Sequence, residues 1–401
     1  MTDLFWPGDH LAGALMSDAA FLDALVAVEQ AWLEGLVVAG IAPPPAAADL
    51  AGYLTDGDLE SIARAADADG NPVTGLVALL RDRTPDPTAR WLHRGLTSQD
   101  VVDTALMLCV HDVFARIGDE FGTQVRVLSE LTERHRDAST LARTLTQAAL
   151  PSTLGVKFAR WLTGLLDAAE PLAGLLASLP VQVGGAVGTL AASTELAGSV
   201  DGAIALSDAL AAALSLAPAP PWHTTRSTVT GIGDALVTCC DAWGHLASDV
   251  ATGSRTEVGE LGESSSGGSS TMPHKQNPVR SVLIRRAALT AGPLGATLHT
   301  ASALSVDERS DGAWHAEWGT LRTLARQTVV AAAHGSALLS GLRVDTARAA
   351  ANLAAAQGLG SEQRAMAELA SRTALPDYLG AADRLVDATL ERARRFTKDP
   401  P

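Results

Sequence analysis

Apolar side chains recur every three to four residues along five long stretches of this chain. The stretches are 101–136, 152–179, 227–256, 279–305 and 313–339. This spacing places the apolar positions on one face of an α-helix, and few prolines interrupt it. Helices of this length bury their apolar faces by packing against one another. The pattern therefore predicts an all-α protein with a long central helical bundle, and its excess apolar surface predicts an oligomer.

The segment before the first long stretch has a pattern of shorter helices. Ser17 can cap a helix over 18–39, in which apolar residues again recur at helical spacing. Shorter helices are expected over 58–66 and 73–81. Residues 1–104 are therefore predicted to form an N-terminal helical domain.

Two later regions break the pattern of long helices. Residues 181–190 contain glycines that weaken a helix, so we expect a non-helical joint within the bundle there. No convincing series of strands is visible. The last residues are rich in alanine and arginine and show only short helical patterns. We therefore predict a central bundle over 105–340 and a small C-terminal helical domain over 341–401.

Composition and charge narrow the class of protein. The chain has 401 residues, of which 47% are hydrophobic and 19% charged, as in globular proteins. Its formal net charge of −15 argues against nucleic acid or an anionic membrane as the main partner. The uncharged stretch 171–194 contains glycines and prolines that make it a poor membrane span. The 3 cysteines show no metal-ligand spacing and the N-terminus shows no signal-peptide pattern, so we expect a cytoplasmic protein with reduced thiols.

Residues 267–278 are expected to form a loop that carries chemistry. They combine glycines, hydroxyl side chains, Lys275, Asn277 and two prolines, which a helix interior does not tolerate. Glycines let backbone N–H groups approach a ligand, Lys275 adds positive charge, and Asn277 can donate and accept hydrogen bonds. The set suits a substrate that bears a carboxylate. A flexible linker is the alternative, whereas a phosphate-binding P-loop is excluded because its G-x-x-x-x-G spacing is missing.

Three blocks of the sequence resemble those of the fumarase/aspartase superfamily. The run G-S-S-T-M-P-H-K-Q-N-P within 267–278 is similar to the signature loop of that superfamily. The runs T-S-Q-D-V-V-D-T over 97–104 and R-T-L-T-Q over 143–147 are similar to its first and second blocks. The resemblance implies three helical domains, with a C-terminal domain longer than the one here, and a homotetramer whose sites are shared between subunits. It implies no cofactor, and the histidines lack metal-ligand spacing, so we expect no metal.

The resemblance also implies roles for residues in these blocks. Superfamily members remove the proton next to a carboxylate, which gives an aci-carboxylate that the site must stabilise. The base would be Ser269, with Lys275 as its catalytic support. The substrate-binding residues would be Thr97, Ser98, Gln99, Thr144, Gln147, Ser270 and Asn277 from these blocks, and Arg309 from the run D-E-R-S over 307–310, which also resembles the superfamily. Two alternatives stay open, since Thr97 and Ser98 can simply cap a helix and Ser270 can serve hydrogen bonding within the loop. Weaker candidates for holding further carboxylates are His223, Arg226 and His274.

The second block departs from most of the superfamily at Leu145. Hydrolyase-type members, adenylosuccinate lyases and argininosuccinate lyases carry a histidine there, which would act on the departing group. Leucine cannot transfer a proton, and a carboxylate leaves without one, so the departure resembles the bacterial 3-carboxy-cis,cis-muconate cycloisomerase branch. That branch implies lactonisation of a small tricarboxylate in the protocatechuate (β-ketoadipate) pathway. An adenylosuccinate-type or other superfamily lyase and a catalytically silent scaffold protein remain alternatives.

Overall fold

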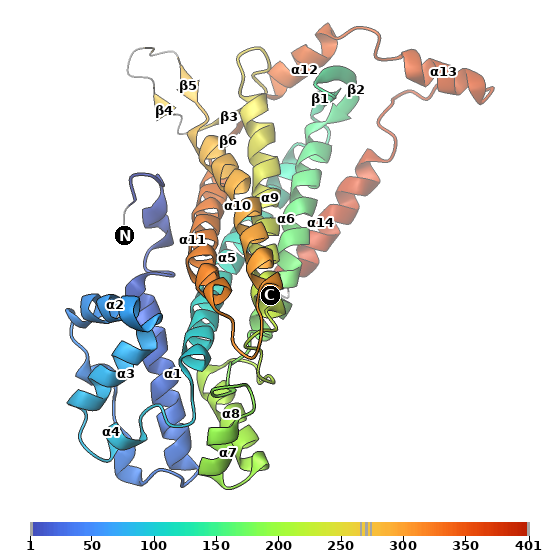
Figure 1. Cartoon of the computed structure of the whole chain (residues 1–401). Coiled ribbons are helices and arrows are strands. Elements are labelled where there is room, and N and C mark those ends of the chain that lie inside the picture. Colours follow the sequence, from blue (N-terminus) through green and yellow to red (C-terminus); the bar gives the residue numbers. More distant parts are fainter. Residues whose placement is uncertain (1–2, 265–266, 269–271, 273–274, 399–401) are drawn as a thin grey trace. The chain divides into compact units, whose positions relative to one another are not determined.

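The computed structural model shows a mostly helical chain, as the hydrophobic pattern predicts (Figure 1). It describes residues 3–264, 267–268, 272 and 275–398. The long helices are α5 Ser98–Arg134, α6 Leu154–Ala177, α9 Ser227–Gly253, α10 Val279–Ala303 and α11 Gly312–Ser340. The shorter ones are α1 Asp18–Val38, α2 Asp58–Asp69, α3 Pro72–Arg83, α4 Thr88–Trp91, α7 Ala191–Ala197, α8 Val200–Leu214, α12 Thr346–Ala355, α13 Ser361–Leu369 and α14 Ala382–Lys398. The all-α class and the five long helices are confirmed, with ends that differ from the predicted ones by a few residues.

Contacts along the backbone divide the chain into two compact units, each built from three segments. The first unit contains residues 1–116, 174–234 and 293–327, and the second contains the rest. The five long helices each contribute residues to both units. The predicted domain boundaries at residues 104 and 340 divide the chain by sequence pattern and not by contacts, so they stay a prediction.

The first unit has its core between α1 and its neighbours. Helix α1 begins after Ser17, whose hydroxyl oxygen accepts a hydrogen bond from the Ala20 N–H, so the predicted cap is confirmed. Trp32 on α1 is fully buried, and its indole N–H donates to the Arg94 carbonyl at 2.7 Å. This bond fixes the chain just ahead of α5, because residues 95–97 follow directly and lead into that helix.

The second unit packs its long helices through large aromatic and amide side chains. The rings of Phe121 on α5 and Trp243 on α9 stack with centroids 4.8 Å apart. The Trp243 indole N–H also donates to the Gln124 side chain at 2.7 Å, and Gln124 donates to the Ala332 carbonyl of α11 at 2.9 Å. The Trp243 indole and the Gln124 amide therefore have partners, which keeps the cost of burying them low.

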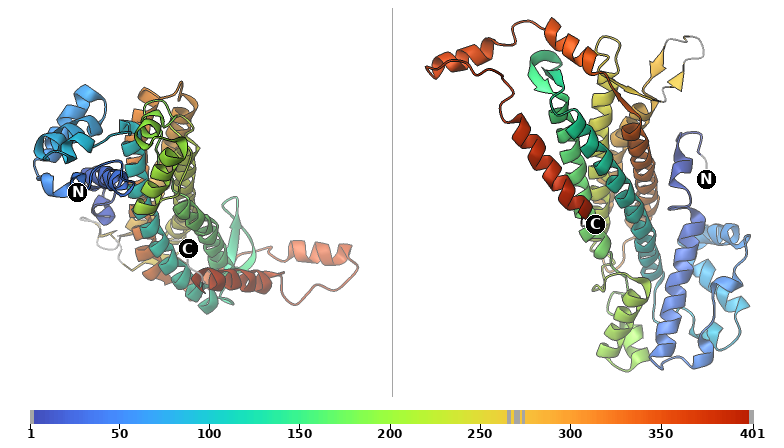
Figure 2. Two further views of the ribbon diagram at one scale, coloured as in Figure 1. Left: turned by 90° about the horizontal axis from the view of Figure 1, so that it is seen from below. Right: turned by 180° about the vertical axis from the view of Figure 1, so that it is seen from behind.

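Three short two-stranded sheets, which the sequence pattern did not predict, join the helices in the part of the chain that the structure describes. Strand β1 Ser139–Thr144 pairs antiparallel with β2 Gln147–Thr153, and β3 Leu261–Glu263 pairs with β6 Leu342–Val344. Strand β4 Gly267–Gly268 pairs with β5 Gln276–Asn277. Helix α12 lies beside β1, as the views in Figures 1 and 2 agree. All of these strands belong to the second unit.

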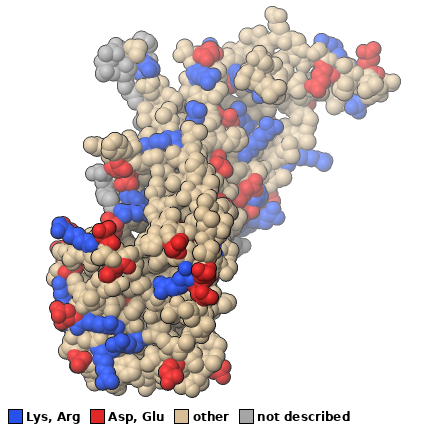
Figure 3. Space-filling model, in the orientation of Figure 1, with Lys and Arg blue, Asp and Glu red and all other residues tan. Residues whose placement is uncertain are grey.

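No single helix in the described part of the chain is long and apolar enough to cross a membrane, although α7 and α8 together meet the length and composition criteria as a pair bent by 105°. On the face drawn in Figure 3, basic and acidic side chains are interspersed. Basic side chains do not gather into one field on that face.

Candidate active site

The first sequence block lies at the start of α5, in the first unit. Thr97 immediately precedes the helix, and its backbone N–H donates to the Asp100 carboxylate at 2.9 Å, which is one half of a capping box. The Thr97 hydroxyl is used differently, because it accepts a hydrogen bond from Arg309 Nη1 at 2.7 Å. Thr97, Ser98 and Arg309 are all half-buried. The fold thus brings together a hydroxyl and a guanidinium that the sequence analysis assigned to substrate binding.

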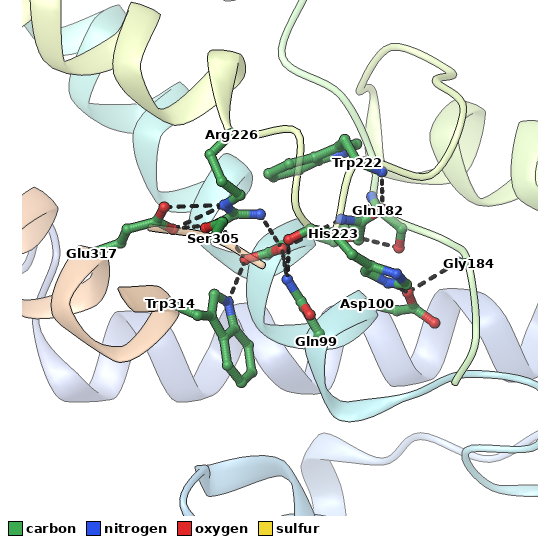
Figure 4. Close-up of polar contacts among 12 residues, drawn as sticks. Gln99, Asp100, Gln182, Gly184, Trp222, His223, Arg226, Ser305, Trp314 and Glu317 are labelled. Atoms are coloured by element: carbon green, nitrogen blue, oxygen red, sulfur yellow. Dashed lines mark hydrogen bonds and ion pairs between the residues drawn. The ribbon is translucent and has the colours of Figure 1, made fainter. Parts of the chain in front are cut away.

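Asp100 connects this block to two other segments of the first unit. Its carboxylate accepts hydrogen bonds from the N–H groups of Gly184 at 3.0 Å and Gly185 at 2.9 Å, and it lies 2.8 Å from His223 Nε2 (Figure 4). A Cβ on Gly184 would lie 2.6 Å from His223 Cε1, so only glycine fits this close approach. The expected non-helical joint at 181–190 is confirmed, and its backbone N–H groups bind Asp100 of the first block.

One turn further along α5, Asp103 takes part in a buried ion network. Arg226 donates to Asp103 at 2.7 and 3.1 Å, and to Glu317 of α11 at 2.5 to 3.1 Å (Figure 4). The Trp314 indole N–H adds a bond to Asp103 at 3.0 Å, and the Trp222 ring lies 4.7 Å from the guanidinium carbon. This network ties the starts of α5, α9 and α11 together within the first unit.

Burial and the neighbouring charges shift the pKa values of groups in this network. Burial raises the pKa of Glu317, and the neighbouring Arg226 offsets only part of that rise. Burial lowers the pKa of Arg226, but Asp103 and Glu317 outweigh that effect, so the guanidinium pKa is raised overall. Arg226 therefore stays charged, and it compensates two carboxylates that water does not reach.

Three of the sequence-predicted candidates lie deeper than a substrate contact would require. Gln99 is fully buried, and its amide N–H₂ donates to Asp103 at 3.2 Å and to the His223 carbonyl at 2.8 Å. His223 and Arg226 were weaker candidates for holding carboxylates, and both are buried and paired with acidic side chains. These three side chains bind Asp100 or Asp103 at the start of α5, and a direct role for Gln99 in substrate binding stays a prediction.

The second block forms the tip of the β1–β2 hairpin, in the second unit. Thr144 pairs with Gln147, so Leu145 and Thr146 are the two central residues of the turn. Both have left-handed backbone angles, with φ of 49° and 70°, in a turn that usually takes asparagine and glycine. The Leu145 side chain is 96% exposed, and Thr144 and Gln147 are exposed as well. The tip therefore presents its side chains outward at a cost in backbone strain.

The base of this hairpin is held by a buried carboxylate. Glu260 accepts hydrogen bonds from Arg143 Nη2 at 2.7 Å, from the Asn352 amide at 2.7 Å and from the Thr140 hydroxyl at 3.3 Å. Burial raises the pKa of Glu260, but these donors, led by Arg143, outweigh it and lower the pKa overall. Arg143 belongs to the second block but is used here to fix the hairpin.

The stem of the signature loop is also built on an acidic side chain. Glu263 is buried, and it accepts from the Ser281 N–H at 2.9 Å and the Arg280 N–H at 3.1 Å at the start of α10. An acidic group is favourable at this end of a helix. On the other side of the stem, Arg343 of β6 donates to the Gln276 side chain at 2.9 Å. The two ends of the loop are thus held close together.

Within the loop, Asn277 pairs with Gly267 as part of the β4–β5 ladder, and its side chain is half-buried. Lys275 is exposed, and its backbone N–H donates to the Met272 carbonyl at 3.0 Å. Ser269 and Ser270, the expected base and a binding candidate, lie outside the described residues, as does His274. Their roles stay predictions.

Sequence reasoning missed the acidic residues that hold these blocks. Glu260, Glu263 and Glu317 lie outside the three motif blocks, and the spacing of apolar residues around them assigns them no role. The signal is their burial, which is known only once the helices are packed. Among the described residues, no three histidine, cysteine or acidic side chains are placed to hold a metal ion.

Comparisons with known proteins agree with the fold and the motif blocks. A family model described as Lyase matches residues 58–291. A nitrosuccinate lyase from Streptomyces davaonensis is 42% identical over 351 residues, which is 85% of this chain and 74% of that protein. A 3-carboxy-cis,cis-muconate cycloisomerase from Pseudomonas aeruginosa is 36% identical over 389 residues, which is 95% of this chain and 83% of that protein.

A solved structure gives the same result. The crystal structure of the 3-carboxy-cis,cis-muconate lactonizing enzyme from Pseudomonas putida superposes with a TM-score of 0.85 at 29% identity, covering 96% of this chain and 97% of that one. The family match spans more than half of the chain, and both the relatives and the solved structure are enzymes by name. The chain therefore belongs to the fumarase/aspartase superfamily and is an enzyme of the lyase family.

Proposed function

We propose that this enzyme makes and breaks a bond between carbon and a weakly basic anion, at the carbon β to a carboxylate. The observation that carries the proposal is Leu145, whose exposed side chain occupies a strained position at the tip of the second block. A turn selected only for stability would have glycine or asparagine there. A side chain kept in spite of strain points to function, and leucine cannot protonate a departing group.

The proposed roles follow from the charges that develop in the reaction. In the direction of bond breaking, the Ser269 alkoxide takes the proton next to a carboxylate, and that carboxylate gains negative charge as an aci-carboxylate. Lys275 and Asn277 stabilise this charge, and Lys275 also favours the alkoxide. Thr97, Ser98 and Arg309 bind a second carboxylate, since the Arg309–Thr97 contact presents a guanidinium and hydroxyls together.

We propose 3-carboxy-cis,cis-muconate cycloisomerisation as the reaction. A carboxylate of the substrate adds to its double bond and forms a lactone, while Ser269, neutral in this direction, delivers a proton to the neighbouring carbon. The same carboxylate departs in reverse without needing a proton. Support comes from several relatives named for this activity at 31% to 37% identity, and from the 0.85 TM-score of the Pseudomonas putida structure. The reaction would serve protocatechuate catabolism through the β-ketoadipate pathway.

A second candidate is the elimination of nitrite from nitrosuccinate, which the 42% identity to the Streptomyces davaonensis enzyme favours. The base would take the proton from one carbon, the C–N bond electrons would leave with nitrite, and a double bond would form to give fumarate. Nitrite, like a carboxylate, is a weak base and departs without a proton. Leu145 is therefore compatible with both reactions, and substrate assays have to separate them.

The assembly and location belong to the same proposal. Thr97 and Arg309 are in the first unit, whereas the other two blocks are in the second. We infer a homotetramer in which the three blocks of each site come from different subunits, and a cytoplasmic location. Light scattering on the active protein tests the assembly, because a fully active monomer would contradict shared sites.

The decisive experiment compares three substrates with the purified protein. Loss of diene absorbance with 3-carboxy-cis,cis-muconate would support the cycloisomerase, and nitrite release from nitrosuccinate, followed colorimetrically, would support the lyase. Adenylosuccinate serves as the control, because its amine leaving group needs a proton donor that Leu145 does not provide. Turnover of adenylosuccinate alone would refute the proposal. Ser269→Ala, which should be inactive with every substrate that is turned over, controls for contaminating enzymes.

A further inference from the structure

A polar cavity of about 220 Å³ lies in the second unit, at the base of the β1–β2 hairpin. Its walls come from three elements. The hairpin contributes Ser152 and Thr153, α6 contributes Lys157 and Arg160, and α9 contributes Asp249. Arg143 of the second block also lines the cavity, but the described lining contains none of the candidate catalytic or substrate-binding residues.

Basic groups in this cavity have hydrogen-bond donors to spare. Lys157 makes one long ion pair, with Nζ 3.8 Å from Asp249 Oδ2, and an ammonium has three N–H donors. Arg160 is exposed and has no hydrogen bond or ion pair within the described residues. The two lie three residues apart on one face of α6, where like charges repel. The Ser152 hydroxyl, also in the cavity wall, has no partner in the described part of the chain either.

The local charge favours an anion. Among the described residues of the wall, Asp249 is the one that carries a carboxylate, and the Trp161 indole N–H already occupies its Oδ2 at 2.8 Å. Arg143 lines the cavity too, but its charge is matched by Glu260. Lys157 and Arg160 therefore outnumber the remaining carboxylate, in a chain whose formal net charge is −15. This local positive charge, opposite in sign to the net charge of the chain, raises the local concentration of small anions.

We propose that this cavity binds a small dianion, either inorganic phosphate or a four-carbon dicarboxylate, through Lys157, Arg160 and Ser152. Two cations and a hydroxyl with free donors match the paired oxygens of such an anion, and its charge relieves the repulsion along α6. Since Ser152 is on β2, the bound anion links the hairpin to α6. The tip of that same hairpin carries the second block, so binding stiffens the segment that presents Leu145.

The test measures binding of inorganic phosphate and of succinate by titration calorimetry. Lys157→Gln and Arg160→Gln should each weaken phosphate binding about tenfold, because each removes one charge-assisted contact. Arg384→Gln is the matched control, an exposed arginine of α14 outside the cavity, and should leave binding unchanged. Circular dichroism shows whether each variant is folded.

Hydrogen exchange gives an independent readout. Phosphate should slow amide exchange over 139–153 in the unaltered protein and not in Arg160→Gln. Loss of succinate binding in the two variants would extend the site to dicarboxylates, whereas retained succinate binding beside lost phosphate binding would restrict it to phosphate. Binding of neither anion, or equal binding in all four proteins, would overturn the proposal. Neither readout depends on catalytic activity, so failure here is distinct from failure of the proposed function.

Discussion

Replacing Arg226 by glutamine should destabilise the protein strongly. The guanidinium is fully buried and makes five hydrogen bonds to Asp103 and Glu317, whose side chains are 0% and 1% exposed. Removing it leaves two carboxylates facing each other without water or a counter-ion. Breaking a buried pair in this way costs about 3–5 kcal/mol, because the remaining charge keeps its desolvation penalty.

The partner substitution should cost much less, which makes the reasoning testable. Glu317→Gln keeps the shape of the side chain and leaves a one-to-one pair of Arg226 with Asp103. Combining both changes removes one of the two stranded carboxylates, so the double variant should be more stable than the sum of the single costs implies, by about 1–3 kcal/mol. Arg64→Gln is the control, since the Arg64–Glu60 pair is 77% and 74% exposed and contributes under about 1 kcal/mol.

The assay is urea unfolding followed by circular dichroism at fixed protein concentration, repeated as the pH is lowered. Burial already raises the pKa of Glu317 in the unaltered protein, and loss of Arg226 raises it further. A carboxyl whose folded pKa lies above its unfolded value is least destabilising below the unfolded pKa. The deficit of Arg226→Gln should therefore be largest at neutral pH and shrink as the pH falls toward about 4. Strictly additive costs and a deficit independent of pH would refute the account.

Three further changes probe the other blocks. Ser269→Ala should lower kcat by at least about a hundredfold through loss of the base, and unchanged turnover would remove Ser269 from the mechanism. Leu145→His should change kcat for a weakly basic leaving group by less than about tenfold, because that group needs no proton, and a far larger loss would mean that Leu145 itself contacts the substrate. Burial raises the pKa of Glu260, but hydrogen bonds from Arg143 and Asn352 outweigh burial and hold the pKa below its usual value. The ionised Glu260 therefore stabilises the fold above the unfolded pKa, and this stabilisation is lost as the pH falls through the folded pKa. Thermal unfolding from neutral pH downward should therefore show a steeper acid loss in the unaltered protein than in Glu260→Gln, and parallel losses would contradict this.

The helices could be predicted because their signal is local and long. A helical period sustained over a stretch such as 313–339 leaves little room for another structure, and Ser17 marks a helix start by a bond to a residue three positions away. The strands could not be predicted in this way. The β1–β2 turn has Leu145 and Thr146 where turn patterns expect asparagine and glycine, and β3 pairs with β6, which lies about eighty residues further along the chain.

For the candidate site as well, local sequence signals could be predicted and long-range packing could not. The sequence motifs identified Thr97 and Arg309, and the structure brings the two together although they are far apart in sequence. The letters could not show that Gln99, in the same block, is fully buried, because burial depends on which segments pack over it. Glu317 is the clearest omission, since only the packing of α11 places it against Arg226.

The three blocks share a construction that explains why short loops can carry this chemistry. Each is fixed by a buried acidic side chain: Asp100 within the first block, Glu260 at the hairpin and Glu263 at the stem of the signature loop. A flexible loop would have to become ordered each time it bound a substrate, at a cost in conformational entropy. A fixed stem orders the loop in the free enzyme and so reduces that cost on binding. The groups at the tips can then be chosen for the reaction alone. On this view the strained turn at Leu145 is tolerable because Glu260 and Arg143 hold the strands beneath it, and weakening that pair should impair the second block before it impairs the fold.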